Sequence, residues 1–147
     1  MTFVKNKKAY FDYSIEDTFE AGIILEGWEV KSIRYGMADI KQAFVKIVEN
    51  GAYISGMHVS RWKTQSASIP INENRERKLL LNSKEIDELA GLRKSSGVSI
   101  IVLELFEKNN KIKVKIGVGR GRKKYDKRQK IKEREMKKEI FAKGKRW

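Results

Sequence analysis

The sequence contains no cysteine, one proline and one histidine among its 147 residues. Without cysteine the chain has no disulfide and no thiolate metal site, which fits a cytoplasmic protein. The single histidine, His58, has no second histidine or cysteine with which to bind a metal or to form a nucleophile–base pair. We therefore expect a structural or surface role for His58.

Long apolar runs are also missing. No stretch approaches the roughly 18 apolar residues that a membrane-spanning helix needs, and the N-terminus lacks the apolar region of a signal peptide. The net charge of +14 and the pI near 9.9 then favour nucleic acid over an anionic membrane as the partner. We expect a cytoplasmic nucleic-acid-binding protein without a cofactor.

The positive charge is concentrated in the C-terminal segment Gly117–Trp147. This segment holds 14 of the 33 Lys and Arg residues and four acidic residues, so it carries +10 of the net charge. The preceding residues have 19 basic and 15 acidic side chains, an ordinary balance for a soluble domain. We expect one domain, residues 1–119, and a basic tail, residues 120–147, that binds an anionic partner.

Extended segments dominate the domain. Alternating and β-branched patterns predict strands within residues 10–25, 43–48, 52–59, 98–106 and 111–118. Asn50-Gly51 and Asn109-Asn110 predict two tight turns between strands. Gly22 indicates a bulge or a close backbone approach.

Two short helices interrupt these strands. One is predicted at residues 26–35, where Gly36 is a stop signal, and one begins at Asn82, which has capping-box spacing to Glu85. Residues 1–8 should lead loosely into the first strand, and residues 60–77 should form a long surface loop. The fold class is therefore mainly β: an OB-like antiparallel barrel with two to three short helices and a basic C-terminal tail.

The tail has two parts. Gly117, Gly119 and Gly121 alternate with basic residues, which predicts a flexible backbone close to phosphates but lacks the GxGxxG spacing of a nucleotide site. Asp126 and Gln129 have capping-box spacing, and the residues that follow favour a helix. Because an isolated helix of about 15 residues is marginal in water, we expect a tail that is disordered when free and helical when bound.

Two groups of side chains have more than one interpretation. The acidic residues Asp12, Glu16, Asp17 and Glu20, which fall in a predicted strand, suit either a solvated face or the divalent-metal site of a nuclease. The aromatic residues Trp28, Tyr35, Trp62 and Tyr125 suit core packing, and those near basic residues, Tyr125 above all, also suit stacking on bases.

Five segments in order resemble the SsrA-binding protein family, also called small protein B or SmpB. They are NKKAYFDY at Asn6–Tyr13, EAGIILEGWEVKSIR at Glu20–Arg34, RKLLL at Arg77–Leu81, and KIGVGRGRKKYDKR with IKERE between Lys115 and Glu135. The resemblance covers about Asn6 to Phe141. Tyr125 departs from the His of many relatives, and the loop sequence INENRER before Lys78 departs from a proline-containing form.

The resemblance implies a bacterial cytoplasmic RNA-binding protein with an OB-like barrel. Its partner would be tmRNA (SsrA RNA) in trans-translation, the rescue of ribosomes stalled on messages without a stop codon. The barrel would bind the tRNA-like domain of tmRNA, and the tail would enter the empty mRNA channel at the decoding centre and fold into a helix. The family is not catalytic and works with elongation factor Tu and GTP.

The resemblance also implies which residues bind RNA. On the barrel they are Asn6, Glu20 and Leu80, with Lys7, Lys8 and Arg34 as phosphate contacts. In the tail they are Arg120, Arg122, Lys123, Lys124, Tyr125, Asp126, Lys127, Arg128, Ile131, Lys132 and Arg134. Two other functions stay open: a metal-dependent RNA-processing enzyme that uses the acidic residues 12–20, and a constitutive ribosomal protein.

Overall fold

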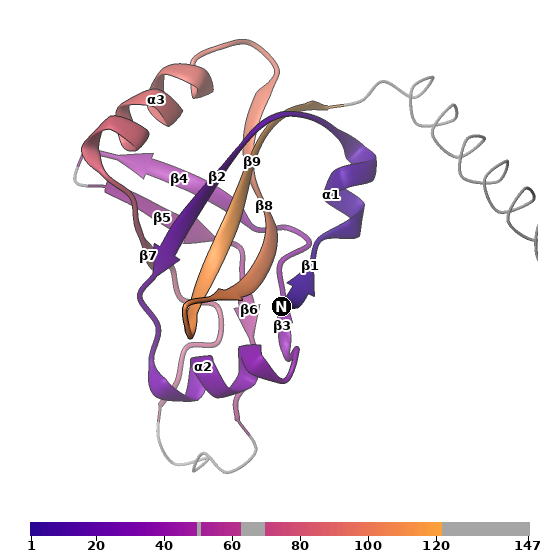
Figure 1. Cartoon of the computed structure of the whole chain (residues 1–147), viewed down its shortest axis with the longest axis vertical. Helices are drawn as coiled ribbons and strands as arrows, with labels where there is room; N and C mark the ends of the chain where they lie inside the picture. The colour runs from indigo at the N-terminus through magenta and orange to yellow at the C-terminus, as the bar shows by residue number, and fades with distance from the viewer. Residues whose placement is uncertain (50, 63–69, 122–147) are drawn as a thin grey trace, which may run out of the picture.

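The computed structural model of the chain describes residues 1–49, 51–62 and 70–121. This part is mainly β, with three short helices, as the sequence predicts (Figure 1). Its elements are β1 (Thr2–Lys5), α1 (Lys7–Asp12), β2 (Tyr13–Ile23), α2 (Gly27–Arg34), β3 (Ala38–Asp39), β4 (Phe44–Val48), β5 (Gly51–Ser55), β6 (His58–Val59), β7 (Arg77–Leu80), α3 (Ser83–Arg93), β8 (Val98–Lys108) and β9 (Lys111–Gly121).

Seven strands form one antiparallel sheet that closes on itself. The strand order is β1-β8-β4-β5-β7-β2-β9, and β9 pairs in turn with β8. The ring from β8 through β4, β5, β7, β2 and β9 is that of a small barrel. Its weakest seam joins β4 to β8, where the register over the described residues is the single pair Phe44 and Ile101. Strands β3 and β6 form a separate two-stranded sheet.

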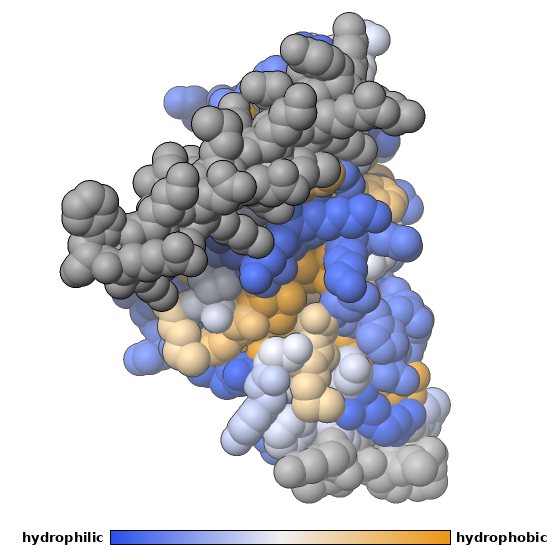
Figure 2. All heavy atoms as spheres, turned by 90° about the vertical axis from the view of Figure 1, so that its right-hand side faces the viewer, coloured by the Kyte–Doolittle hydropathy of each residue, from blue (hydrophilic) through white to orange (hydrophobic). Residues whose placement is uncertain are grey.

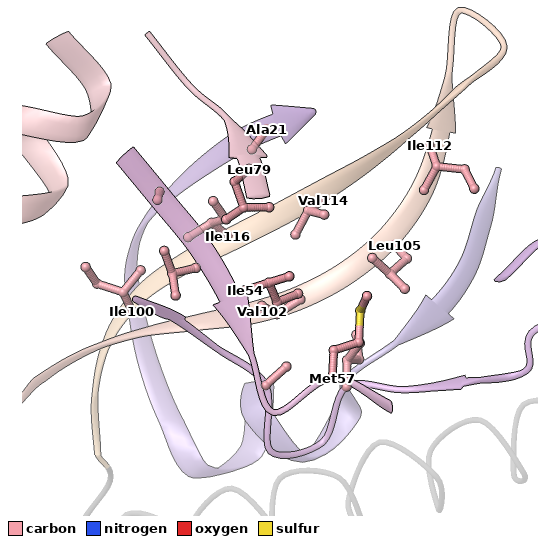
Figure 3. Packing of buried hydrophobic residues seen from close by; sticks show 14 of the residues in the cluster. Ala21, Ile54, Met57, Leu79, Ile100, Val102, Leu105, Ile112, Val114 and Ile116 are labelled. Atoms are coloured by element: carbon pink, nitrogen blue, oxygen red, sulfur yellow. The ribbon is translucent and has the colours of Figure 1, made fainter. Parts of the chain in front are cut away.

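An apolar core fills the barrel (Figure 3). In β9 the residues Ile112, Val114 and Ile116 are buried, while Lys111 is exposed and Lys113 and Lys115 are partly exposed. This alternation, one apolar face and one basic face, is the pattern that the sequence predicts for the strand. The basic face therefore lies on the outside of the barrel.

A second apolar cluster lies outside the barrel wall, beneath α1. It consists of Ala9, Ile101 and Leu103, with partly buried Tyr10, Tyr13 and Ile15 around them. The strands pack too closely here to leave room for a side chain at two glycines of β9. A Cβ on Gly117 would lie 2.7 Å from Leu103 Cδ1, and a Cβ on Gly119 would lie 2.9 Å from the Ser14 carbonyl oxygen. The predicted flexible backbone at Gly117–Gly121 is therefore wrong, because these residues are strand residues that leave room for close packing.

The N-terminal prediction also needs correction. Residues 1–8 do not lead loosely into a strand at Tyr10, because β1 pairs with β8 and α1 then occupies Lys7–Asp12. The helix begins where the Asn6 side chain accepts a hydrogen bond from the Ala9 amide, at 3.1 Å. An N-cap of this kind satisfies an amide that an isolated first turn leaves without an acceptor.

Local turn and cap signals, by contrast, are confirmed. Asn82 and Glu85 form the expected capping box of α3. Asn109 and Asn110 both have positive φ, 53° and 63°, at the β8–β9 turn, as a two-residue hairpin loop requires. Asn50 of the other predicted turn lies outside the described residues.

The predicted strand at residues 52–59 is divided at Gly56, where φ is 77° and a Cβ would lie 2.6 Å from the Gln42 carbonyl oxygen.

A buried ion pair joins α2 to β7. Glu29 and Arg77 are both fully buried, and Arg77 Nε donates to Glu29 Oε2 at 2.5 Å. The remaining Arg77 donors bind the carbonyl oxygens of Met57 (2.7 Å) and Glu73 (3.1 Å), and Arg75 binds the other oxygen of Glu29. Burial lowers the pKa of the Arg77 guanidinium, and the Glu29 carboxylate opposes this shift. The predicted surface loop through Arg77 is therefore wrong at its last residue.

Removal of one charge from this pair should destabilise the fold. We expect Glu29→Gln to lower the free energy of unfolding by about 3–5 kcal/mol, because Arg77 then stays buried without its counter-ion. Urea denaturation measures the change. The control is Glu76→Gln, which removes the exposed ion pair with Lys46 and should cost less than about 1 kcal/mol. Equal effects of the two variants would contradict the importance of the buried pair.

Candidate nucleic-acid interface

Strands β2 and β7 bring two of the expected residues, Glu20 and Leu80, onto one outer surface together with residues of β9 and β8. Ala21 is buried in the core, so its neighbours Glu20 and Gly22 point outward. Gly22 lies between Leu80 of β7 and Lys113 of β9, and Glu20 lies beside Lys115. We call the surface formed by Glu20, Gly22, Leu80, Glu104, Lys113 and Lys115 the barrel face.

Leu80 is an exposed apolar side chain on this face. It is 55% exposed, and it lies over Gly22, where an added Cβ would be 3.2 Å from Leu80 Cβ. This confirms the close approach expected at Gly22, whereas the β2 bulge lies between Ile15 and Asp17. Leu80 borders a groove of about 310 Å³ whose lining includes Arg34 and Lys113. An apolar contact surrounded by cations suits a nucleic acid, which offers bases and phosphates together.

Two acidic residues of β2, Glu16 and Glu20, bind cations of the protein. Lys108 Nζ lies 2.9 Å from Glu20 Oε2, and Arg120 Nε lies 2.9 Å from Glu16 Oε1. Asp12 ends α1 and does not alternate with the others in a strand. Within residues 1–49, 51–62 and 70–121, no three metal-binding side chains gather in one place. The solvated interpretation of the acidic residues therefore describes Glu16 and Glu20 better than the metal-site interpretation.

Glu104 and Tyr10 extend the barrel face toward α1, and neither residue was expected from the sequence. Glu104 accepts hydrogen bonds from Tyr10 Oη at 3.0 Å and from Thr2 Oγ1 at 3.1 Å, and Lys115 Nζ lies 3.6 Å away. Burial, with the hydrogen bond and the charge of Glu104, raises the pKa of Tyr10 to about 12. The signal in the sequence was a glutamate within the apolar run of β8.

Arg34 lies in a different part of the molecule from Lys7 and Lys8. Arg34 ends α2, pairs with Glu107 at 2.8 Å, lies over the Phe3 ring and lines the Leu80 groove. Lys7 and Lys8 are exposed in the first turn of α1. On the side that carries α1, hydrophilic side chains border a small apolar area (Figure 2). The structure therefore groups Arg34 with Leu80, and the two lysines with α1.

Asn6 is buried, with 2% of its surface exposed. Its Nδ2 donates to the carbonyl oxygens of Ile40 (3.0 Å) and Val102 (3.1 Å), and its Oδ1 caps α1. The side-chain amide therefore has both donor hydrogens and its acceptor in use within the protein. Asn6 positions α1 on the barrel instead of presenting its own side chain to a ligand.

Of the expected tail residues, Arg120 is the one in the described part of the chain. It lies in β9, binds Glu16 and donates to the Ser96 carbonyl oxygen at 2.6 Å, so the barrel extends through Gly121. The other tail residues and the predicted helix after Asp126 lie outside the described residues: Arg122, Lys123, Lys124, Tyr125, Asp126, Lys127, Arg128, Ile131, Lys132 and Arg134.

The remaining aromatic residues divide as follows. Trp28 is buried, and its Nε1 donates to Glu26 Oε2 at 2.6 Å. Tyr35 is 74% exposed and lies against Trp62 with ring centroids 4.9 Å apart. Core packing therefore describes Trp28 but not Tyr35.

His58 Nδ1 lies 2.8 Å from Asn74 Oδ1. This contact links β6 to the segment before β7.

The small barrel, with a basic and apolar outer face, defines a nucleic-acid-binding barrel protein. A sequence model of the family described as SmpB protein matches residues 3–146. The chain belongs to the SmpB family.

Similar proteins agree with this assignment. The chain is 45% identical to the SsrA-binding protein of Helicobacter hepaticus, over 94% of this chain and 90% of the relative, and 43% identical to that of Bordetella pertussis, over 95% and 90%. A solved chain described as "tmRNA-SmpB: a journey to the center of the bacterial ribosome" matches with a TM-score of 0.68 and 30% identity, over 86% of this chain and 92% of that chain. None of the described helices is long and apolar enough to cross a membrane.

The raised pKa of Tyr10 leads to a pH-dependent stability. The folded state binds the phenolic proton more tightly than the unfolded state, whose tyrosine pKa is 10.0. The contribution of Tyr10 to stability is therefore complete below pH 10 and is lost as the pH rises toward 12. We expect the difference between the spectrophotometric titrations of the wild type and Tyr10→Phe to show one phenol that ionises well above pH 10. Ionisation at the ordinary value would refute the partly buried contact between Tyr10 and Glu104.

The burial of Asn6 predicts a structural cost for its removal. Asn6→Ala removes the hydrogen bonds that the side chain donates to the Ile40 and Val102 carbonyl oxygens, and it removes the α1 cap. It should therefore lower the free energy of unfolding by about 1–3 kcal/mol. The control is Lys7→Ala, an exposed neighbour in the same turn, which should change it by less than about 0.5 kcal/mol. If urea denaturation gives the same value for both variants, the anchoring role of Asn6 is wrong.

Proposed function

We propose that this protein binds the tRNA-like domain of tmRNA (SsrA RNA) through its barrel face and delivers tmRNA to stalled ribosomes in trans-translation. One observation carries the assignment to this face. Glu20 and Leu80, which match family positions implied to bind RNA, point outward from neighbouring rows of the same sheet. The relatives named SsrA-binding protein, which cover nearly the whole chain, supply the identity of the RNA.

The chemistry of the barrel face suits a folded RNA. Leu80 offers an apolar contact to a base or a sugar, and Lys113 and Arg34 on the same groove neutralise phosphates. Glu20 lies among cations, bound to Lys108 and next to Lys115, so it orients these lysines and accepts a hydrogen bond from a base edge. Because several cations replace counter-ions on the RNA, binding should weaken steeply as the salt concentration rises.

The remaining expected RNA contacts divide into two sets. Lys7 and Lys8 contact phosphates from α1, whose position depends on the buried Asn6. The basic tail contacts ribosomal RNA in the empty mRNA channel at the decoding centre, through residues from Arg120 to Arg134. The barrel thus selects the RNA cargo, and the tail detects a ribosome without a message.

The protein acts as an adaptor and not as an enzyme. Glu16 and Glu20, the acidic residues that an RNA-processing enzyme would use, are each bound by a basic side chain. The adaptor works in the cytoplasm, without a cofactor of its own, and in association with elongation factor Tu and GTP. As a rescue factor it accompanies tmRNA and stalled ribosomes, whereas a constitutive ribosomal protein would be present in every ribosome.

Two variants should separate the two surfaces. Leu80→Ala should weaken binding of the tRNA-like domain on the order of tenfold, about 1.4 kcal/mol, because it removes the apolar contact of the groove. Deletion of residues 126–147 should leave most of that affinity intact and abolish peptide tagging on stalled ribosomes. Filter binding and a tagging assay measure the two results.

The control for Leu80→Ala is Val48→Ala, another exposed apolar residue, which should leave binding unchanged. Normal tagging by the truncated protein would show that the tail has no role at the decoding centre. Equal affinity of the Leu80 variant and the wild type would show that RNA binds elsewhere on the barrel.

A further inference from the structure

A second groove lies between α1 and α3 and lacks the residues of the barrel face. It has a volume of about 480 Å³, within the roughly 300–1,000 Å³ of small-molecule sites. Lys8 of α1, Lys41 and Phe44 of the stretch 41–45, and Arg93 of α3 line it together with residues 98–101 of β8, so four segments contribute to it. Of the residues expected to bind tmRNA, Asn6 and Lys8 line it, whereas Glu20, Leu80 and Lys113 do not, so the barrel face does not explain its ligand.

The groove is a consequence of the seam in the barrel wall. Strands β4 and β8 share the pair Phe44 and Ile101, and the Val102 amide donates to the Ala43 carbonyl oxygen at 3.4 Å. On one side of this point β4 and β8 separate. There Arg93 of α3 donates a hydrogen bond to the Ile47 carbonyl oxygen of β4 at 3.4 Å. Buried apolar residues form the floor: Ala43, Val45, Ile100 and Ile101. The hollow is thus built on the rigid core.

Phe44 gives this groove an aromatic surface. Its side chain is 47% exposed although it belongs to a barrel strand. A half-exposed ring beside an apolar floor offers a planar surface on which a nucleobase can stack. An aliphatic side chain in the same place would offer apolar contact without this preference for a flat ring.

The charge around Phe44 is predominantly positive. Lys8, Lys41 and Arg93 line the groove together with one acidic residue, Asp12. Arg34, Lys108 and Arg120 elsewhere on the barrel each bind a carboxylate. Lys8 and Lys41, by comparison, form no ion pair with any of the residues that the structure describes. Two exposed ammonium groups and a guanidinium are therefore available to an anion beside the ring.

We propose that this groove binds one unpaired nucleotide of a single-stranded RNA, with its base against Phe44 and its flanking phosphates held by Lys8, Lys41 and Arg93. Single-stranded RNA combines a flat ring with an anion on either side, which matches the arrangement of Phe44 and the three cations. An acidic peptide would satisfy the cations but would leave the aromatic ring unused. The site shares Lys8 with the expected contacts of tmRNA, and Phe44, Lys41 and Arg93 lie outside the barrel face.

Photo-crosslinking of the full chain tests this proposal. The probe is a short single-stranded oligoribonucleotide with one 4-thiouridine, and mass spectrometry identifies the crosslinked residues. We expect crosslinks at Phe44 and its neighbours in the groove, and about tenfold weaker binding by Phe44→Ala. Phe44→Tyr should keep the affinity, because its ring also stacks. Every variant carries the same basic tail, so non-specific binding by the tail is common to all of them.

Matched controls lie on the same strand. Val48→Ala and Lys46→Ala change an exposed apolar residue and an exposed lysine of β4 outside the groove, and both should bind as the wild type does. Lys41→Ala should reduce the slope of log affinity against log salt by about one. Unchanged urea midpoints show that the variants are folded.

Several outcomes would overturn the site. One is that Phe44→Ala and Val48→Ala bind the oligonucleotide with equal affinity, and another is that Phe44→Tyr and Phe44→Ala lose affinity equally. Crosslinks outside the groove would also contradict the site. So would polyglutamate that binds as tightly as the oligonucleotide and depends on Phe44. Uridine monophosphate that binds as tightly as the oligonucleotide would refute recognition of a strand. Leu80→Ala should not change the crosslink at Phe44, and a loss there would merge this site with the barrel face. Failure of the Leu80→Ala prediction alone would leave this groove supported.

Discussion

The buried pair of Glu29 and Arg77 is the interaction on which the arrangement of the barrel face depends. Two charges can stay inside this small barrel because the arginine donates hydrogen bonds to the carboxylate and to two backbone carbonyl oxygens. With Arg77 held inward, the alternation of a strand places Leu79 inward and Lys78 and Leu80 outward. The exposure of Leu80 therefore follows from an ion pair on the opposite side of the strand.

Elements with strong local signals could be predicted from the sequence, and elements that depend on distant partners could not. The β8–β9 hairpin followed from β-branched alternation and Asn109-Asn110, and α3 followed from its capping box. The helix α1 was missed because its cap, Asn6, is held by carbonyl groups 34 and 96 residues away. Arg77 was assigned to a surface loop because its counter-ion lies 48 residues earlier in the chain. Such partners meet only when the barrel closes.

The same distinction applies to the candidate site. Resemblance to a family pointed to Glu20, Arg34 and Leu80, and the strand register explains why residues so far apart can act together. Resemblance alone could not separate Leu80, which is exposed, from Asn6, which is buried and acts through the helix that it holds. Nor could it identify the neighbours Tyr10 and Glu104, whose contact depends on how α1 lies against β8.

Gly117 and Gly119 determine how closely the last strand packs in the sheet. Gly117 and Gly119 let β9 lie between β2 and β8, so the strand is paired on both edges up to Arg120, and Gly121 pairs with Tyr13 of β2. The basic tail is therefore attached at a residue that is fixed within the sheet. Because this attachment point and the barrel face belong to one sheet, any rotation of the barrel moves the attachment point by the same angle.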